Sequence, residues 1–166
     1  MKPFSPAGFL RRLLLISCAA TASSLTAADL VVADFEGSDF ASWKSEGEAF
    51  GKGPAKGAVN GQMEVSGFSG SGFANSFHGG DDAVGTLTSP EFKIERKFIN
   101  FLIGGGKNPG ETCFDLLLDG KVVRTATGPN DRPGGSERLG WETWDTSGLI
   151  GKSVSIRIVP SGEVWR

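Results

Sequence analysis

Glycine and proline interrupt this chain every few residues, and this punctuation constrains the fold more than any other feature. The sequence holds 25 glycines and 8 prolines in 166 residues. Beyond the first 28 residues, no stretch keeps apolar residues at helical spacing over several turns. Short β-prone runs between such turn signals are typical of a β-sandwich or jelly roll. We therefore predict an all-β, antiparallel fold.

Eight short runs between the turn signals are predicted to be strands. Asp119-Gly120 lies between two β-prone runs, and because Asp-Gly readily adopts positive φ in a tight turn, it predicts a hairpin. Residues 154–159 alternate apolar and polar side chains, the period of a strand with one buried face. Segment 47–70 has too many apolar residues for a disordered linker and is predicted to be a long ordered loop. The predicted strands are 30–35, 72–77, 85–87, 98–103, 112–118, 122–127, 142–145 and 154–159.

The first residues are typical of an export signal. A basic pair precedes an apolar run, which small residues follow as far as Ala28. The apolar run is well below the roughly 18 to 20 residues of a membrane span. We therefore predict a signal peptide over 1–28, one β-sandwich domain over 29–166, and a secreted, periplasmic or cell-surface location. The residues before Cys18 resemble a lipobox and leave lipidation of that cysteine open.

Charge, cysteine content and histidine content restrict the classes of function that the chain can have. The formal net charge is −2 and the pI about 5.5, which disfavours binding to nucleic acid. Cys113 has no disulfide partner in the predicted domain, and its apolar neighbours favour a structural thiol over a nucleophile. His78 is the only histidine, so a multi-histidine zinc site is excluded. Asp81 and Asp82 leave a Ca²⁺ site open, although their glycine neighbours also favour a simple turn.

Five segments carry a resemblance to a known family. They are 34–37 (DFEG), 47–51 (GEAFG), 61–63 (GQM), 92–106 and 119–128. In this order they resemble the N-terminal β-sandwich domain that precedes the catalytic propeller in levanase-like members of glycoside hydrolase family 32. The resemblance implies an accessory domain of a secreted polypeptide that degrades fructans, such as levan or inulin, or sucrose.

The resemblance also implies that this domain is not catalytic. In the resembled family, the nucleophilic Asp and the acid/base Glu belong to the propeller, and neither of their motifs occurs in this chain. Asp131-Arg132-Pro133 reverses the first two residues of the family's Arg-Asp-Pro triplet and is predicted to be a turn. The family's last strand and propeller follow the strand that matches 154–159. The resemblance therefore implies that the chain is truncated at its carboxyl end, without the catalytic propeller, and it leaves open whether the sandwich also lacks its last strand.

Sugar binding requires an aromatic face and planar polar groups on a pre-formed surface. Trp144 lies in an apolar alternation and is predicted to be in the core, whereas the role of Trp141 is left open. The polar loop 128–138 is the preferred sugar-facing segment. The candidate carbohydrate-binding residues are Asn108, Arg124, Asn130, Asp131, Arg132, Glu137 and Trp141.

Three functions are compatible with these observations. The first is a carbohydrate-binding accessory module with a fructan as its partner. The second is a structural spacer that packs on a catalytic propeller. The third is an enzyme in its own right. The missing motifs disfavour this function, even if the name glycosyl hydrolase is inherited from longer relatives.

Overall fold

The computed structural model describes residues 28–160. The chain divides into two compact units, residues 1–31 and 32–166, and all described strands belong to the second. The predicted signal peptide, with Cys18, lies outside the described residues apart from Ala28. Between residues 28 and 160, no helix is long and apolar enough to cross a membrane.

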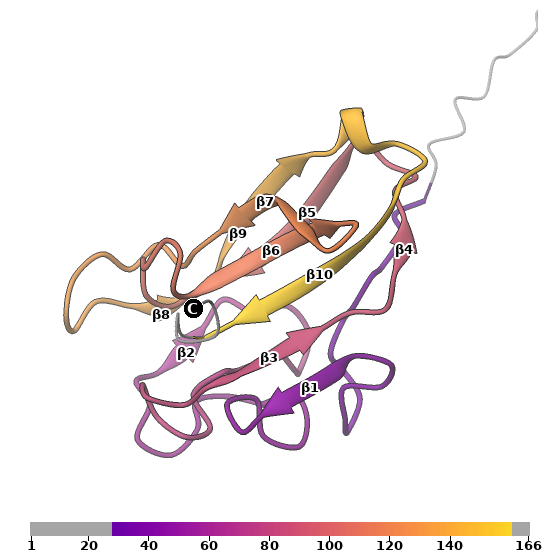
Figure 1. Ribbon diagram of the computed structural model, residues 1–166. Helices are drawn as coiled ribbons and strands as arrows, with labels where there is room; N and C mark the ends of the chain where they lie inside the picture. The colour runs from indigo at the N-terminus through magenta and orange to yellow at the C-terminus, as the bar shows by residue number, and fades with distance from the viewer. Residues whose placement is uncertain (1–27, 161–166) are drawn as a thin grey trace, which may run out of the picture. The chain divides into compact units, whose positions relative to one another are not determined.

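The described part of the second unit is all-β, as predicted (Figure 1). Apart from one short 3-10 helix, η1 (Ser147–Leu149), its described regular elements are strands. The strands are β1 (Lys44–Gly47), β2 (Val65–Ser66), β3 (Gly85–Thr88), β4 (Phe92–Lys93), β5 (Phe98–Ile103), β6 (Cys113–Leu118), β7 (Lys121–Ala126), β8 (Glu137–Arg138), β9 (Gly140–Asp145) and β10 (Ser153–Val159).

The strands form one large antiparallel sheet and two small ones. The large sheet has the order β1-β3-β10-β6-β7, and β4 pairs with the beginning of β10. Strands β5 and β9 form a separate antiparallel pair, which we call the β5–β9 ribbon, and β2 and β8 form a short parallel pair. The large sheet and the ribbon share one hydrophobic core, so the unit is a β-sandwich.

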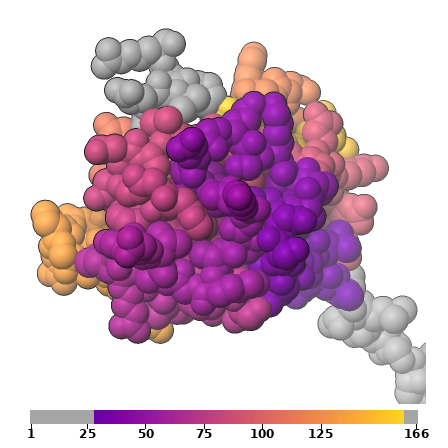
Figure 2. Space-filling model, turned by 90° about the horizontal axis from the view of Figure 1, so that it is seen from below, coloured from indigo at the N-terminus to yellow at the C-terminus, as the bar shows by residue number. Residues whose placement is uncertain are grey.

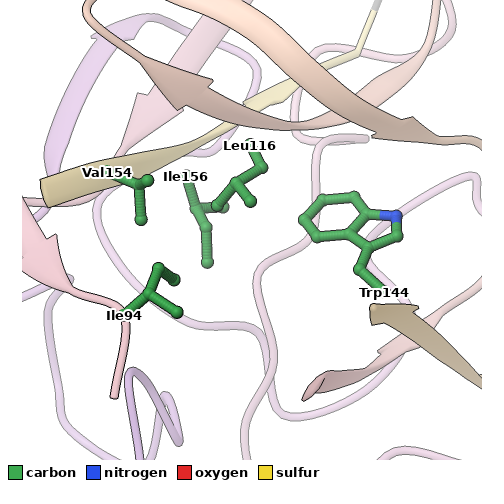
Figure 3. Close-up of a cluster of buried hydrophobic side chains, with 5 residues drawn as sticks. All are labelled: Ile94, Leu116, Trp144, Val154 and Ile156. Carbon is green, nitrogen blue, oxygen red and sulfur yellow. The ribbon is translucent and has the colours of Figure 1, made fainter. Parts of the chain in front are cut away.

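The centre of this core joins β9 to the large sheet (Figure 3). The indole ring of Trp144 points toward Leu116 of β6, with Ile156 and Val154 of β10 and Ile94 beside them. Leu116 is fully buried and Trp144 is 7% exposed. Burial of an apolar side chain of this size contributes about 1.5 to 3 kcal/mol. Trp144 is therefore a core residue, as predicted.

A second cluster lies beneath the first segments of the unit. It contains Phe40, Ala49, Phe50 and Leu87, and the partly buried Phe35 packs against it. Figure 2 shows segments of the first half of the described chain, in indigo to magenta, side by side on this face. Aromatic rings meet edge to face here, with a centroid distance of 6.0 Å between Phe35 and Phe40. This packing orders a region that has few strands.

The predicted hairpin is present between β6 and β7. Leu118 pairs with Lys121, and the two residues between them, Asp119 and Gly120, have φ values of 51° and 72°. Positive φ at both central positions defines the type I′ turn, whose twist matches that of the strands.

Two predicted strands, 30–35 and 72–77, are not formed. Phe35 has φ 55°, in the left-handed region that interrupts an extended chain. In the second segment, the Asn75 Oδ1 atom accepts a hydrogen bond from the Phe77 N–H at 3.0 Å, a local bond that competes with sheet pairing. Segment 72–77 keeps only a single bridge, between Phe73 and Ala55.

The predicted loop 47–70 is ordered and includes the short strand β2. Ala55, Val65 and Phe73 form a small buried cluster beneath it. An amide pair also holds it, because the buried Asn75 donates from Nδ2 to Gln62 Oε1 at 2.7 Å. The loop is therefore fixed by packing and by a shielded hydrogen bond.

Candidate functional site

The loop between β7 and β8 is held against the glycine-rich loop that follows β5. The Asn130 N–H donates to Gly105 O at 3.0 Å, and the Lys107 N–H donates to Asn130 O at 2.7 Å. A Cβ atom on Gly128 would lie 2.1 Å from Gly105 O, so a side chain does not fit there. The glycine run after β5 therefore lies in close backbone contact with this loop.

This loop surrounds a hollow of about 400 Å³. Asp131 and Arg132 are exposed at its side, and the Gly135 N–H donates to Arg132 O at 3.2 Å, which forms the predicted turn. The Asn130 side chain lies against Gly135, where a Cβ atom would clash with it. Three predicted residues, Asn130, Asp131 and Arg132, thus meet around one hollow. Its lining residues are Pro129, Asn130, Asp131, Arg132, Gly134, Gly135, Ser136 and Arg138.

Asn108 and Glu137 lie in or beside the same two loops. Asn108 follows the backbone bridge between Gly106 and Asn130 by two residues, and its N–H donates to Thr127 Oγ1 at 3.1 Å. Glu137 is half-buried in β8, and this burial raises the pKa of its carboxyl group, with a further contribution from the negative charge of Asp81. Both residues are therefore near the loop hollow.

The Ca²⁺ site that the sequence left open at Asp81 and Asp82 gains no support from residues 28–160. Asp81 and Asp82 are both exposed. Within this described part, no three His, Cys, Asp or Glu residues are grouped so that they could hold a metal ion.

Arg124 lies apart from the other predicted residues. Its Nη2 atom donates to the backbone oxygen of Asp145 at 3.1 Å, at the end of β9 that is remote from the β8–β9 junction. Hydrogen bonds from the Ser147 hydroxyl and N–H lower the pKa of Asp145, and the positive charge of Arg124 lowers it further. Arg124, a residue of β7, therefore contacts the end of the ribbon that is remote from the β8–β9 junction.

The side of the ribbon that faces away from the core is exposed and carries two aromatic rings. Residues directly opposite each other in an antiparallel pair share one face, and Leu102 pairs with Trp141 while Phe98 pairs with Asp145. Trp141 is 69% exposed and Phe98 is 54% exposed. We call this surface the ribbon outer face; its six residues are Phe98, Asn100, Leu102, Trp141, Thr143 and Asp145.

Between the two aromatic ends of this face lies a neutral polar pair. The Thr143 hydroxyl donates to Asn100 Oδ1 at 2.8 Å, and both residues are exposed. Because the hydroxyl proton is used in this bond, the pair offers the Asn100 NH₂ group as a donor and the Thr143 oxygen as an acceptor. No described residue accepts a hydrogen bond from that NH₂ group.

Of the predicted residues, only Trp141 belongs to the ribbon outer face. Phe98, Asn100 and Thr143 were not predicted as site residues. Because 98–103 is predicted to be a strand, Phe98 and Asn100, two positions apart, are expected on one side of it. Their position on the same face as Trp141 depends on the pairing of β5 with β9, about which the local pattern carries no information.

The chain is similar to one part of a much longer protein. It is 38% identical over 133 residues to a protein of Aspergillus rugulosus named "Putative glycosyl hydrolase ecdE". The aligned region covers 78% of this chain and 18% of that protein, so the chain spans about a fifth of its relative's length. This similarity relates the chain to a glycosyl hydrolase. No family model matches the chain. No solved structure matches it either.

Proposed function

We propose that this domain is a non-catalytic carbohydrate-binding module of a secreted, fructan-degrading glycosyl hydrolase. The observation that carries the proposal is the exposed indole of Trp141 on the ribbon outer face, beside the neutral pair of Asn100 and Thr143. An indole held on a strand is a preformed platform for the apolar side of a sugar ring. The polar pair supplies both a donor and an acceptor to sugar hydroxyls.

Two further observations support an accessory role. The relative is named a glycosyl hydrolase, and the aligned region is only 18% of its length, which is the proportion expected of one module in a larger polypeptide. The choice of fructan rests on the resemblance of segments 34–37, 47–51, 61–63, 92–106 and 119–128 to levanase-like proteins.

The ribbon outer face is poorly suited to glycoside hydrolysis. Retaining hydrolysis needs two carboxyl groups roughly 5 to 5.5 Å apart, one of them protonated to act as the acid. Asp145 is the only carboxylate among the six residues of this face, and its lowered pKa keeps it ionised near neutral pH, so it carries no proton to give to a leaving group. Glu137 has a raised pKa and Asp81 as its neighbour, so a hydrolytic activity of the chain would be sought first at that pair.

The test is affinity electrophoresis of the purified protein in gels that contain levan or inulin, with starch as the comparison polymer. We expect retardation by a fructan that disappears in Trp141→Ala and persists in Val122→Ala. Val122 is a matched control because it is 49% exposed and belongs to β7 in the other layer. We also expect no release of fructose from either polymer. Release that is abolished by Glu137→Gln would overturn the non-catalytic assignment.

One observation favours a second candidate, a spacer that packs on a neighbouring catalytic domain. Phe98 and Trp141 expose apolar surface on one face, as a docking surface between domains does. A spacer would show no retardation by levan or inulin. The electrophoresis therefore separates the two candidates.

A further inference from the structure

We infer that the ribbon outer face binds a linear oligosaccharide lengthwise, so that the module recognises internal segments of a polymer and not its ends. This inference rests on the proposed function and extends it from one platform to an extended site. The structural basis is the pair of aromatic residues at opposite ends of the face, Trp141 and Phe98, with a polar pair between them.

The six residues of the ribbon outer face form three rungs. One rung pairs Leu102 with Trp141, the next pairs Asn100 with Thr143, and the third pairs Phe98 with Asp145. Successive residues on one face of a strand are two positions apart, so the outer rungs are separated by about 14 Å along the strands. This separation exceeds the width of one hexose ring. A single sugar unit cannot contact Trp141 and Phe98 together, whereas a short chain can contact both.

The exposure of the two aromatic rings favours an internal segment of the polymer. A site for a chain end or a small sugar is expected to be a concave pocket that covers most of the ligand. Trp141 and Phe98 are 69% and 54% exposed, so neither ring lies within an enclosing wall. A polymer that lies across both rings can therefore continue beyond each end of the face.

The distribution of charge indicates a neutral polymer. The first two rungs carry only apolar and uncharged polar side chains. The one ionised group of the face, Asp145, lies in the third rung, and the backbone oxygen of this residue accepts a hydrogen bond from Arg124. Because the centre offers an amide donor and a hydroxyl acceptor, a chain of hydroxylated sugars fits it better than a charged polymer does.

The experiment is isothermal titration calorimetry with inulin-type oligosaccharides of increasing length, from the disaccharide upward. We expect affinity to rise with length until the ligand spans both rings, and then to level off. Phe98→Ala should remove this rise and weaken binding of the long oligosaccharides about tenfold, while binding of the shortest ligand that is detected stays unchanged. Trp141→Ala should weaken binding at every length, and Val122→Ala should change nothing.

Two outcomes would overturn this inference, and they have different meanings. If long and short oligosaccharides bind equally tightly and Phe98→Ala has no effect, the lengthwise site is wrong while the sugar-binding function stands. If no oligosaccharide of any length binds, the proposed function fails as well. Circular dichroism of Phe98→Ala and Trp141→Ala checks that the fold is intact. We expect it to be intact because the side chains of Phe98 and Trp141 are exposed.

Discussion

Trp141 and Trp144 lie three residues apart on the same strand, yet their surroundings are opposite. Trp144 is 7% exposed and stacks on Phe114 with a ring-centroid distance of 5.1 Å, whereas Trp141 is 69% exposed on the other side of the ribbon. The alternation of a strand produces this difference, since an odd spacing turns two side chains to opposite faces. One indole therefore stabilises the sandwich, and the other is available to a ligand.

The largest predicted effect comes from removing the buried indole. Trp144→Ala deletes a ring that contacts both Phe101 and Phe114 in the core, and we expect it to lower the free energy of unfolding by about 3 to 5 kcal/mol. Trp141→Ala is the matched control and should change stability by no more than about 0.5 kcal/mol. Urea denaturation followed by circular dichroism measures both. Equal losses of stability would contradict the division of the ribbon into a core face and a ligand face.

A smaller effect is expected from the polar pair of the outer face. Thr143→Val keeps the side-chain shape and removes the hydroxyl that donates to Asn100. We expect fructan binding to weaken by about threefold to tenfold, the size of one hydrogen bond. The free energy of unfolding should change little, because the pair is exposed. Calorimetric titration and urea denaturation of the same sample separate the two effects, and unchanged affinity would remove the pair from the site.

The smallest effect concerns the pH dependence of stability at the charged end of the face. Hydrogen bonds from Ser147 lower the pKa of Asp145 in the folded protein. Its contribution to stability is therefore complete above the unfolded value of about 3.9 and is lost as the pH falls through the lowered pKa. We expect Asp145→Asn to lower the melting temperature slightly at pH 7 and not at all in strong acid. A difference that grows on acidification would contradict this assignment.

The sequence predicted those strands that are defined by a local pattern. The Asp119-Gly120 turn and the alternation in 154–159 specify their elements without reference to the rest of the chain. Strand β1 shows the opposite case, because Lys44–Gly47 has four exposed residues and becomes a strand through its pairing with β3. Segment 30–35 has the residue pattern of a strand, but the positive φ of Phe35 interrupts its extended backbone.

The site could be predicted only in part, for a related reason. The burial of Trp144 was predicted from the alternation of apolar and polar residues in its segment. The exposure of Trp141 was not predicted, because the strand was expected to begin at residue 142. Strand β9 begins at Gly140, so Trp141 lies on the same strand as Trp144 and, at an odd spacing, on the opposite face. The roles of Phe98 and Asn100 depend on the register between β5 and β9, which are about forty residues apart in sequence. No pattern within either segment specifies that register.

The most direct test of the ribbon outer face is to follow the indole N–H signals in ¹H–¹⁵N spectra while a fructan oligosaccharide is added. Single substitutions assign the signals of Trp141 and Trp144. The account predicts that the Trp141 signal shifts with the affinity measured by calorimetry, together with backbone signals of 98–102 and 141–145, while the Trp144 signal stays in place. Shifts confined to the loop hollow at 129–138, with no change at Trp141, would contradict it.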